Sequence, residues 1–235
     1  MNAPETVGQE VVLRILGGTA DDYDRIVDKS TGGLDRRWKQ WMLDRMDEPT
    51  QVLDLASGTG ILSFLILDRF PNCHLTGVDL QADYQAVARG RSQQRGLQDR
   101  TTWIHSSVES AELPDGRYDL VTSCYVPKYA DRPVLTENLW RWTAPGAHIL
   151  LHDFAHPEDP RIDRYLKKQY DLWLAKVRRT HPHWVHCFED LYDIVKASPW
   201  TEDFGPLLEA QGFTDVTLTR LDHGTAAVLE ARKPS

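Results

Sequence analysis

A glycine-rich turn with a carboxylate on either side is the part of the chain best suited to chemistry. The turn 56–60 reads ASGTG, and Asp54 stands just before it. Asp79 follows about twenty residues after the first glycine, the spacing at which a carboxylate accepts hydrogen bonds from a ribose diol. Glycine lets the chain turn tightly and lets a ligand approach the backbone. The pattern predicts a ligand with an unphosphorylated ribose.

The residues around the turn indicate which ribose ligand binds. A dinucleotide site requires G-x-G-x-x-G, but the third glycine position is Ser63. The carboxylate of Asp54 would repel a pyrophosphate and favour an ammonium or a sulfonium. S-adenosylmethionine carries both groups, so we expect Asp54 to hold its methionine end and Asp79 its ribose. The turn residues expected to share the methionine end are Ser57, Gly58, Thr59 and Gly60.

Alternating strands and helices must position these residues. The alternation predicts an α/β fold, a Rossmann-like seven-stranded and mostly parallel sheet with helices on both faces. The last strand is expected to run antiparallel, at one edge. Ligands of such sheets bind at the carboxyl ends of the strands. The expected strands are 52–55, 75–79, 101–105, 118–123, 147–151, 214–220 and 225–231, and helices are expected at 61–70, 81–96 and 134–142.

The length of 235 residues suits a single domain with a well-buried core. We find no internal repeat and no low-complexity linker. Residues 1–5 are expected to be loose. The expected parts of the domain are an N-terminal helical cap (1–48), a cofactor-binding core (50–154), a helical lid inserted after the fifth strand (155–200) and the C-terminal part of the sheet (201–235).

Charge and composition exclude several classes of protein. A formal net charge of −8 argues against a protein whose main task is binding nucleic acid or an anionic membrane. No apolar run is long enough to span a membrane, and we expect no signal peptide. Three scattered cysteines suggest no disulfide framework. We therefore expect a cytoplasmic protein with a small-molecule substrate; the sequence does not indicate its oligomeric state.

The segments VLDLASGTG and GVDL resemble motifs I and II of the class I S-adenosylmethionine-dependent methyltransferases. Most of the chain is similar to one branch, the ubiquinone/menaquinone biosynthesis C-methyltransferases. The resemblance implies methyl transfer to a small aromatic or apolar acceptor, with C-methylation of a quinone precursor as the reaction of that branch. It also implies that segment 23–41 covers the active site. The matching residues there are Tyr23, Asp24, Arg36, Arg37 and Trp38.

The resemblance extends to further cofactor and substrate residues. It implies that Leu80 in motif II and Cys124 belong to the cofactor site, and that Ser107 and Val108 meet the adenine, with Glu109 as another acceptor for the adenine amino group. The segment 124–129, CYVPKY, departs from the glycine-phenylalanine-glycine-leucine-arginine-asparagine usual in the family. The polar side chains that we expect near the substrate there are Tyr125 and Lys128.

The segment 152–157, HDFAHP, follows the fifth strand and resembles the family's acid-phenylalanine-serine-x-proline. Carbon methylation of a hydroquinone requires its phenol to lose a proton, and an imidazole or a carboxylate could assist. The candidates are Tyr23, His152 and Asp153, and His156 is expected beside the substrate.

Several alternatives remain open. An O- or N-methyltransferase of a secondary metabolite would share every cofactor residue. A non-methylating S-adenosylmethionine-binding protein would also fit. An NAD-dependent oxidoreductase is disfavoured by Asp54 and Ser63. The histidines of segment 181–187, HPHWVHC, fit no zinc-binding spacing, and Pro182 disrupts their helical register, so we expect no metal site.

Overall fold

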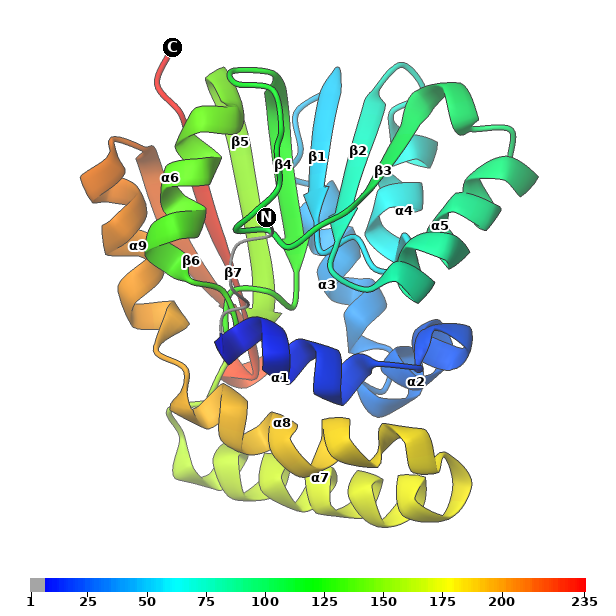
Figure 1. The fold of residues 1–235 in the computed structure, drawn as a ribbon. Coiled ribbons are helices and arrows are strands. Elements are labelled where there is room, and N and C mark those ends of the chain that lie inside the picture. Colours follow the sequence, from blue (N-terminus) through cyan, green and yellow to red (C-terminus); the bar gives the residue numbers. More distant parts are fainter. Residues whose placement is uncertain (1–6) are drawn as a thin grey trace.

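Seven strands form one sheet in the computed structural model, which describes residues 7–235. Their order is β3-β2-β1-β4-β5-β7-β6, and the first five strands pair in parallel (Figure 1). This confirms the expected α/β fold. The expectation for residues 1–5 lies outside the described part of the chain. The strands are β1 (Gln51–Leu55), β2 (His74–Asp79), β3 (Thr101–His105), β4 (Tyr118–Cys124), β5 (Thr143–Phe154), β6 (Thr214–Leu221) and β7 (Ala226–Arg232).

Helices surround the sheet on both faces and at one end (Figure 1). The α-helices are α1 (Val7–Leu16), α2 (Tyr23–Ser30), α3 (Leu34–Leu43), α4 (Ile61–Arg69), α5 (Ala82–Gln94), α6 (Arg132–Trp142), α7 (Pro160–Thr180), α8 (Val185–Ala197) and α9 (Trp200–Gln211). Short 3-10 helices are η1 (Ala20–Asp22), η2 (Gln98–Arg100), η3 (Pro182–Trp184) and η4 (Asp222–Gly224).

The last strand is antiparallel, as expected, but its predicted place at the edge is wrong. β7 lies between β5 and β6 and is antiparallel to both. Its residues 226–229 are all buried and apolar, whereas every residue of β6 is half-buried or exposed. A strand buried on both faces belongs inside a sheet, and a polar strand is suited to the edge.

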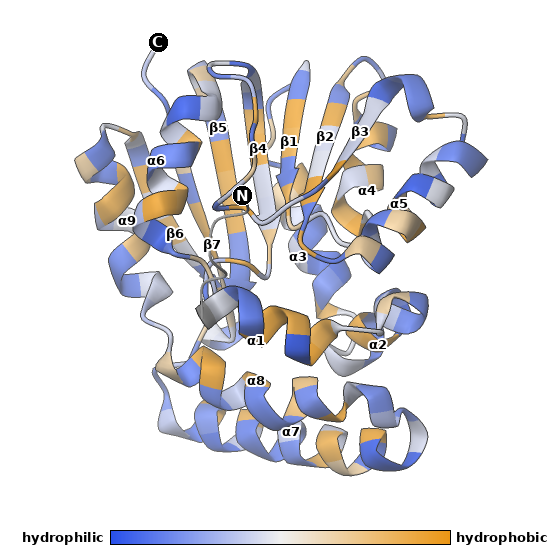
Figure 2. Ribbon diagram, viewed as in Figure 1, coloured by the Kyte–Doolittle hydropathy of each residue, from blue (hydrophilic) through white to orange (hydrophobic). Residues whose placement is uncertain are grey.

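Two apolar cores lie on opposite faces of the sheet because successive strand residues point to opposite sides. Val52 of β1 packs in the core beneath α3 and α4. The next residue, Leu53, packs in the core beneath α6 and α9. Figure 2 shows the resulting concentration of hydrophobic residues along the strands. With both faces covered, the carboxyl ends of the strands remain the place for a ligand.

The N-terminal helices and the α7–α8 pair lie across those carboxyl ends (Figure 1). They share a third apolar cluster, in which Ile15 of α1 and Ile26 of α2 meet Val177 of α7 and Phe188 of α8. Asp22 strengthens this contact, because its carboxylate accepts hydrogen bonds from the indole of Trp184 (2.7 Å) and from Arg25 (2.9 Å). Segments 7–30 and 160–197 therefore pack together and cover the carboxyl end of the sheet.

Candidate active site

The glycine turn brings β1, β2 and the start of α4 close together. Gly60 has a φ of 88°, and a Cβ there would lie 2.6 Å from the ring of Phe64. On β2, a Cβ on Gly77 would lie 2.5 Å from the ring of Trp103 and 2.9 Å from Ser57 Oγ. Glycine is therefore required at both positions. The N-terminus of α4 has no side-chain cap among the described residues, so its N–H groups are available to a ligand.

Asp79 ends β2 beside this turn. Its carboxylate accepts hydrogen bonds from the backbone N–H groups of Gly58 (2.7 Å) and Gln81 (2.8 Å), which fix its orientation. Burial raises the pKa of this carboxyl to about 6, although both hydrogen bonds act in the opposite direction. At neutral pH the group is ionised and can accept further hydrogen bonds from a diol.

Asp54 lies deeper, on β1. Its carboxylate accepts hydrogen bonds from Ser63 Oγ (2.5 Å) and Thr122 Oγ1 (2.9 Å). Burial raises its pKa to about 6, while the two hydroxyls and the ammonium of Lys39 lower it. Ser63, which replaces the third glycine of a dinucleotide motif, therefore supports the acidic group. The arrangement holds a buried negative charge behind the turn, suited to a cationic ligand group.

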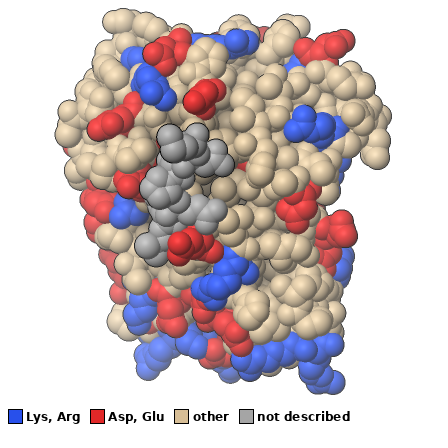
Figure 3. Space-filling view, viewed as in Figure 1, with Lys and Arg blue, Asp and Glu red and all other residues tan. Residues whose placement is uncertain are grey.

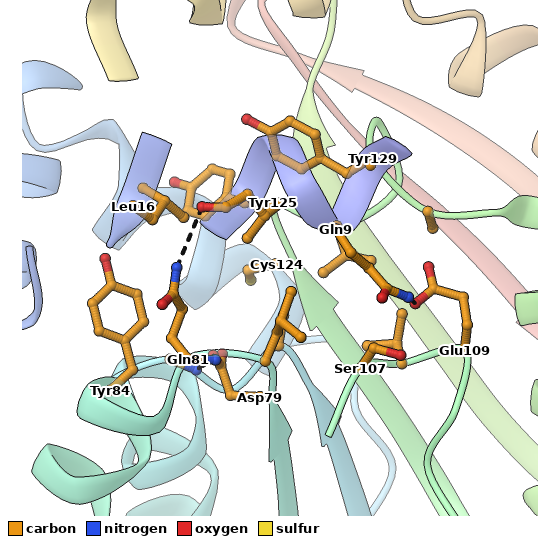
Figure 4. Close-up of a pocket in the computed structure, with 18 of the residues that line it drawn as sticks. Gln9, Leu16, Asp79, Gln81, Tyr84, Ser107, Glu109, Cys124, Tyr125 and Tyr129 are labelled. Carbon is orange, nitrogen blue, oxygen red and sulfur yellow. Dashed lines mark hydrogen bonds between the residues drawn. The ribbon is translucent and has the colours of Figure 1, made fainter. Parts of the chain in front are cut away.

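A main cleft of about 670 Å³ opens between α1 and the carboxyl ends of β1, β2 and β4 (Figure 4). A smaller turn chamber adjoins it behind the glycine turn. Of the expected site residues, the main cleft is lined by Tyr23, Gly58, Asp79, Leu80, Ser107, Val108, Cys124 and Tyr125. The turn chamber is lined by Asp54, Ser57 and Thr59 together with Tyr23, Gly58, Cys124 and Tyr125.

One end of the main cleft is partly polar. Ser107 and Val108 line it, and the Ser107 hydroxyl accepts a hydrogen bond from the Ser110 N–H (3.1 Å). The Glu109 carboxylate accepts one from Gln9 Nε2 of α1 (2.8 Å; Figure 4). Helix α1 therefore closes the cleft with a side chain that the sequence did not single out.

Tyr125 and Tyr23 stand where three cavities meet. Both line the main cleft, the turn chamber and a third cavity, the apolar chamber beneath α8. Tyr125 has a φ of 69°, stacks on Phe154 (4.8 Å between ring centroids) and donates a hydrogen bond to Asp35 (2.5 Å). Burial raises the pKa of both tyrosines well above the usual range. Both phenols are therefore protonated at neutral pH and can donate a hydrogen bond.

Lys128 and Asp153 form a fully buried ion pair. The Lys128 Nζ donates to Asp153 (2.7 Å) and to the Tyr125 carbonyl oxygen (2.9 Å). Asp153 also accepts the backbone N–H groups of Lys128 (2.9 Å) and Phe154 (2.7 Å). Both oxygens of Asp153 are thus occupied, and it lines none of the cavities described here. This position suits Asp153 to holding Lys128, which does line the apolar chamber. A role for Asp153 in taking a proton from the substrate stays a prediction.

His152 is completely buried between the rings of Trp38 and Tyr125, each 5.2 Å away. Burial, with the positive charges of Lys39 and Lys128, lowers its pKa well below the usual range. Neither ring nitrogen has a hydrogen-bond partner among the described residues. His152 lines none of the cavities described here, so Tyr125 would have to move before this imidazole met a substrate.

His156 lies away from these cavities. Its ring Nε2 is hydrogen-bonded to Asp163 Oδ1 of α7 (3.0 Å), and the residue lines an outer groove together with Lys196 and Arg220. None of the main cleft, turn chamber or apolar chamber is lined by His156, so its expected place beside the substrate stays a prediction without support from these cavities. The sheet carries His152 to the carboxyl end of β5, but the chain turns outward by residue 156.

A groove beneath α7 adjoins the apolar chamber. Chamber and groove share Phe154, Phe188 and Leu191. Among the described residues, no group of three His, Cys, Asp or Glu side chains is placed to hold a metal ion, and no described helix is long and apolar enough to cross a membrane. His181 and His183 instead contact Arg25 (3.0 Å) and Asp22 (3.2 Å).

Comparison with known proteins identifies the family. A sequence model of the ubiE/COQ5 methyltransferase family matches residues 5–233. The chain belongs to this family. Ubiquinone/menaquinone biosynthesis C-methyltransferases of Bartonella quintana and Allorhizobium ampelinum are 28% and 25% identical to it, covering 97% and 94% of this chain and 90% and 88% of theirs.

Solved structures share the fold. A candidate S-adenosylmethionine-dependent methyltransferase from Methanococcus maripaludis superposes with a TM-score of 0.66 at 15% identity, over 100% of this chain and 98% of its own. Haemonchus contortus phosphoethanolamine N-methyltransferase 2, solved with S-adenosylmethionine, gives 0.64 at 14% identity, over 98% and 61%. The chain is thus an S-adenosylmethionine-dependent methyltransferase, as its motifs predicted.

The sequence reading missed Lys39, a buried lysine in this ubiE/COQ5 family member. Lys39 lines the turn chamber with Asp54 and is paired with Asp35, four residues earlier on α3. Burial lowers its pKa, but the electrostatic effects of Cys124 and of the Asp35 and Asp54 carboxylates outweigh this, and the pKa is raised. The i, i+4 spacing was visible, but it usually marks an exposed pair. Only the docking of α3 over the sheet end shows that this ammonium faces the cavity.

Proposed function

We propose that this methyltransferase methylates a carbon atom of an aromatic, apolar acceptor of the quinone-precursor type. The observation that carries the proposal is the position of Tyr125, which lines both the main cleft and an apolar chamber walled by aromatic side chains. The relatives named above act in ubiquinone and menaquinone biosynthesis, and their names support this acceptor class. The three cysteines are free, in keeping with a reducing cytoplasm.

The cofactor residues take roles that follow from their positions. Asp79 would accept the ribose hydroxyls, and Ser107 and Val108 would border the adenine. Asp54 and Lys39, both facing the turn chamber, would meet the ammonium and the carboxylate of the methionine end. The remaining cofactor contacts would come from Ser57, Gly58, Thr59, Gly60, Leu80 and Cys124. When bound, S-adenosylmethionine supplies an electrophilic methyl group on a good leaving group.

On the acceptor side, the protein would align the ring and favour its phenolate. Lys128 Nζ lies 4.2 Å from the ring centroid of Tyr129 and 5.7 Å from that of Phe154, so its charge is held among aromatic walls. An ammonium there would stabilise a phenolate oxygen of the acceptor. Tyr23 would donate a hydrogen bond to the same oxygen. His152 would support the position of Tyr125, and in-line alignment in a water-poor chamber would supply the rest of the rate.

The decisive experiment measures S-adenosylhomocysteine formation with a panel of acceptors. We expect turnover with a prenylated hydroquinone and a new carbon–methyl bond in the product. Turnover only with alcohols, catechol oxygens or amines would make the protein an O- or N-methyltransferase. Cofactor binding without turnover on any acceptor would support the non-methylating alternative.

A further inference from the structure

The outer face of α7 differs in charge from the rest of the molecule. The helix carries seven Lys or Arg residues and only two acidic ones, whereas the whole chain has a formal net charge of −8. Figure 3 shows Lys and Arg side chains gathered along the lower edge of the molecule, where α7 lies in Figure 1. The net charge of the whole chain argued against binding to an anionic membrane, but α7 carries a local excess of basic residues.

Much of this positive charge is not neutralised within the protein. Arg161, Lys167 and Arg178 each pair with a carboxylate. Arg164, Lys168, Lys176 and Arg179 have no acidic partner within ion-pair distance among residues 7–235, and all four are exposed. A helix face with unpaired cations favours an anionic partner.

The same face exposes two large hydrophobic side chains. Tyr165 and Leu172 are 62% and 55% exposed, and of the large hydrophobic residues in the described chain only Val134 is also exposed. At about 100° per residue, positions seven apart lie on one side of a helix. Lys168 lies about one turn from each. Gln169 and Trp173, on the opposite side of Tyr165 and Leu172 from Lys168, line the apolar groove. The two exposed hydrophobic side chains therefore lie between the unpaired basic side chains and the groove.

We propose that this face of α7, formed by Arg164, Tyr165, Lys168, Leu172 and Arg179, docks on a lipid bilayer that contains anionic phospholipid. Unpaired basic side chains would meet the phosphates, and Tyr165 and Leu172 would enter the interface. The groove would then open at the membrane, and an apolar acceptor could enter without crossing water. The docking itself does not depend on the proposed function; this delivery step does.

Other partners fit the face less well. A second copy meeting it through the same face would bring two sets of unpaired cations together, which is repulsive. A nucleic acid would use the cations but would gain nothing from an exposed leucine beside an apolar groove. Both remain outcomes of the test.

The test is flotation of the full-length protein with vesicles of phosphatidylcholine alone or with about 30% phosphatidylglycerol. We expect binding only to the anionic vesicles and its loss in high salt. Lys168→Glu/Arg179→Glu should weaken the partition coefficient more than tenfold, and Tyr165→Ser/Leu172→Ser severalfold. The matched control is Arg69→Glu/Arg117→Glu, an equal charge change at the opposite end of the sheet, which should bind as the wild type does.

Several results would overturn the proposal. The first is no binding of the wild type to anionic vesicles, and the second is a loss of vesicle binding in the control variant equal to that in the α7 variants. The third is binding to duplex DNA as strong as to vesicles and unchanged when Leu172 is replaced. The fourth is a dimer in solution that the α7 variants disrupt. Melting curves would confirm that the variants fold. Normal turnover of a short-chain acceptor without vesicle binding would refute the docking alone. Vesicle binding without turnover of any acceptor would refute the proposed function alone.

Discussion

Replacing Lys128 with methionine tests whether the buried Lys128–Asp153 ion pair stabilises the protein. In Lys128→Met the Asp153 carboxylate stays fully buried, without a cation, and keeps only the two backbone N–H groups of residues 128 and 154. Breaking a buried ion pair from one side costs about 3–5 kcal/mol. Because two donors remain, we expect a loss near the lower end, about 3 kcal/mol. Asp153→Asn should lose a similar amount, since it leaves the ammonium buried.

The double variant Lys128→Met/Asp153→Asn leaves neither charge buried. Its loss of unfolding free energy should therefore be smaller than the sum of the single losses, with a coupling of about 2 kcal/mol. Urea unfolding at pH 7.5 measures all four proteins, and Lys128→Arg serves as the charge-retaining control.

Additive losses would refute the reasoning, because they would mean that the two groups do not stabilise each other. A second readout separates support from proton transfer. If Asp153 only positions Lys128, Asp153→Asn should lower kcat but keep the shape of its pH profile. The disappearance of one ionisation from that profile would restore Asp153 as a proton acceptor.

Three further predictions concern the cofactor site. At a hundred times its dissociation constant, S-adenosylhomocysteine should stabilise the wild type by about 2.7 kcal/mol in thermal melts, and it should stabilise Asp79→Ala clearly less. NAD should not change the melting temperature, and a shift with NAD would contradict the cofactor assignment. Asp54→Asn should stabilise the ligand-free protein at pH 7.5 by roughly 1–3 kcal/mol. The sign follows because the folded pKa of about 6 lies above the model value of 3.8, so Asp54 costs stability as pH rises from about 4 through 6; an unchanged pH dependence in the variant would contradict this. Lys39→Met should raise KM for S-adenosylmethionine about tenfold with little change in kcat, whereas a fall in kcat alone would exclude a carboxylate contact.

The geometry around the glycine turn could be predicted from sequence because it depends on local spacing. The turn, Asp54 and Asp79 are fixed by two strands and their immediate ends, and the structure places them together. The position of β7 was predicted wrongly, although its run of apolar residues favours the interior of a sheet.

The acceptor half could not be predicted in the same way because it depends on packing between distant segments. Sequence places His152, Asp153 and His156 after one strand, but it does not show which cavity, if any, each side chain meets. Burial by Trp38 and pairing with Lys128 decide this for the first two. Lys39 reaches the turn chamber only because α3 crosses the sheet end.

The raised pKa values of Asp54 and Asp79 connect cofactor binding to stability. Both carboxylates are buried at a cost in the ligand-free protein. A cationic ligand group would offset that cost for Asp54, so affinity should rise as pH increases through about 6. S-adenosylhomocysteine keeps the ammonium but lacks the sulfonium charge. If Asp54 meets the ammonium, both ligands should show the same pH dependence in calorimetric titrations. If only S-adenosylmethionine shows this pH dependence, the Asp54 carboxylate acts on the sulfonium, and the assignment of Asp54 to the ammonium is wrong.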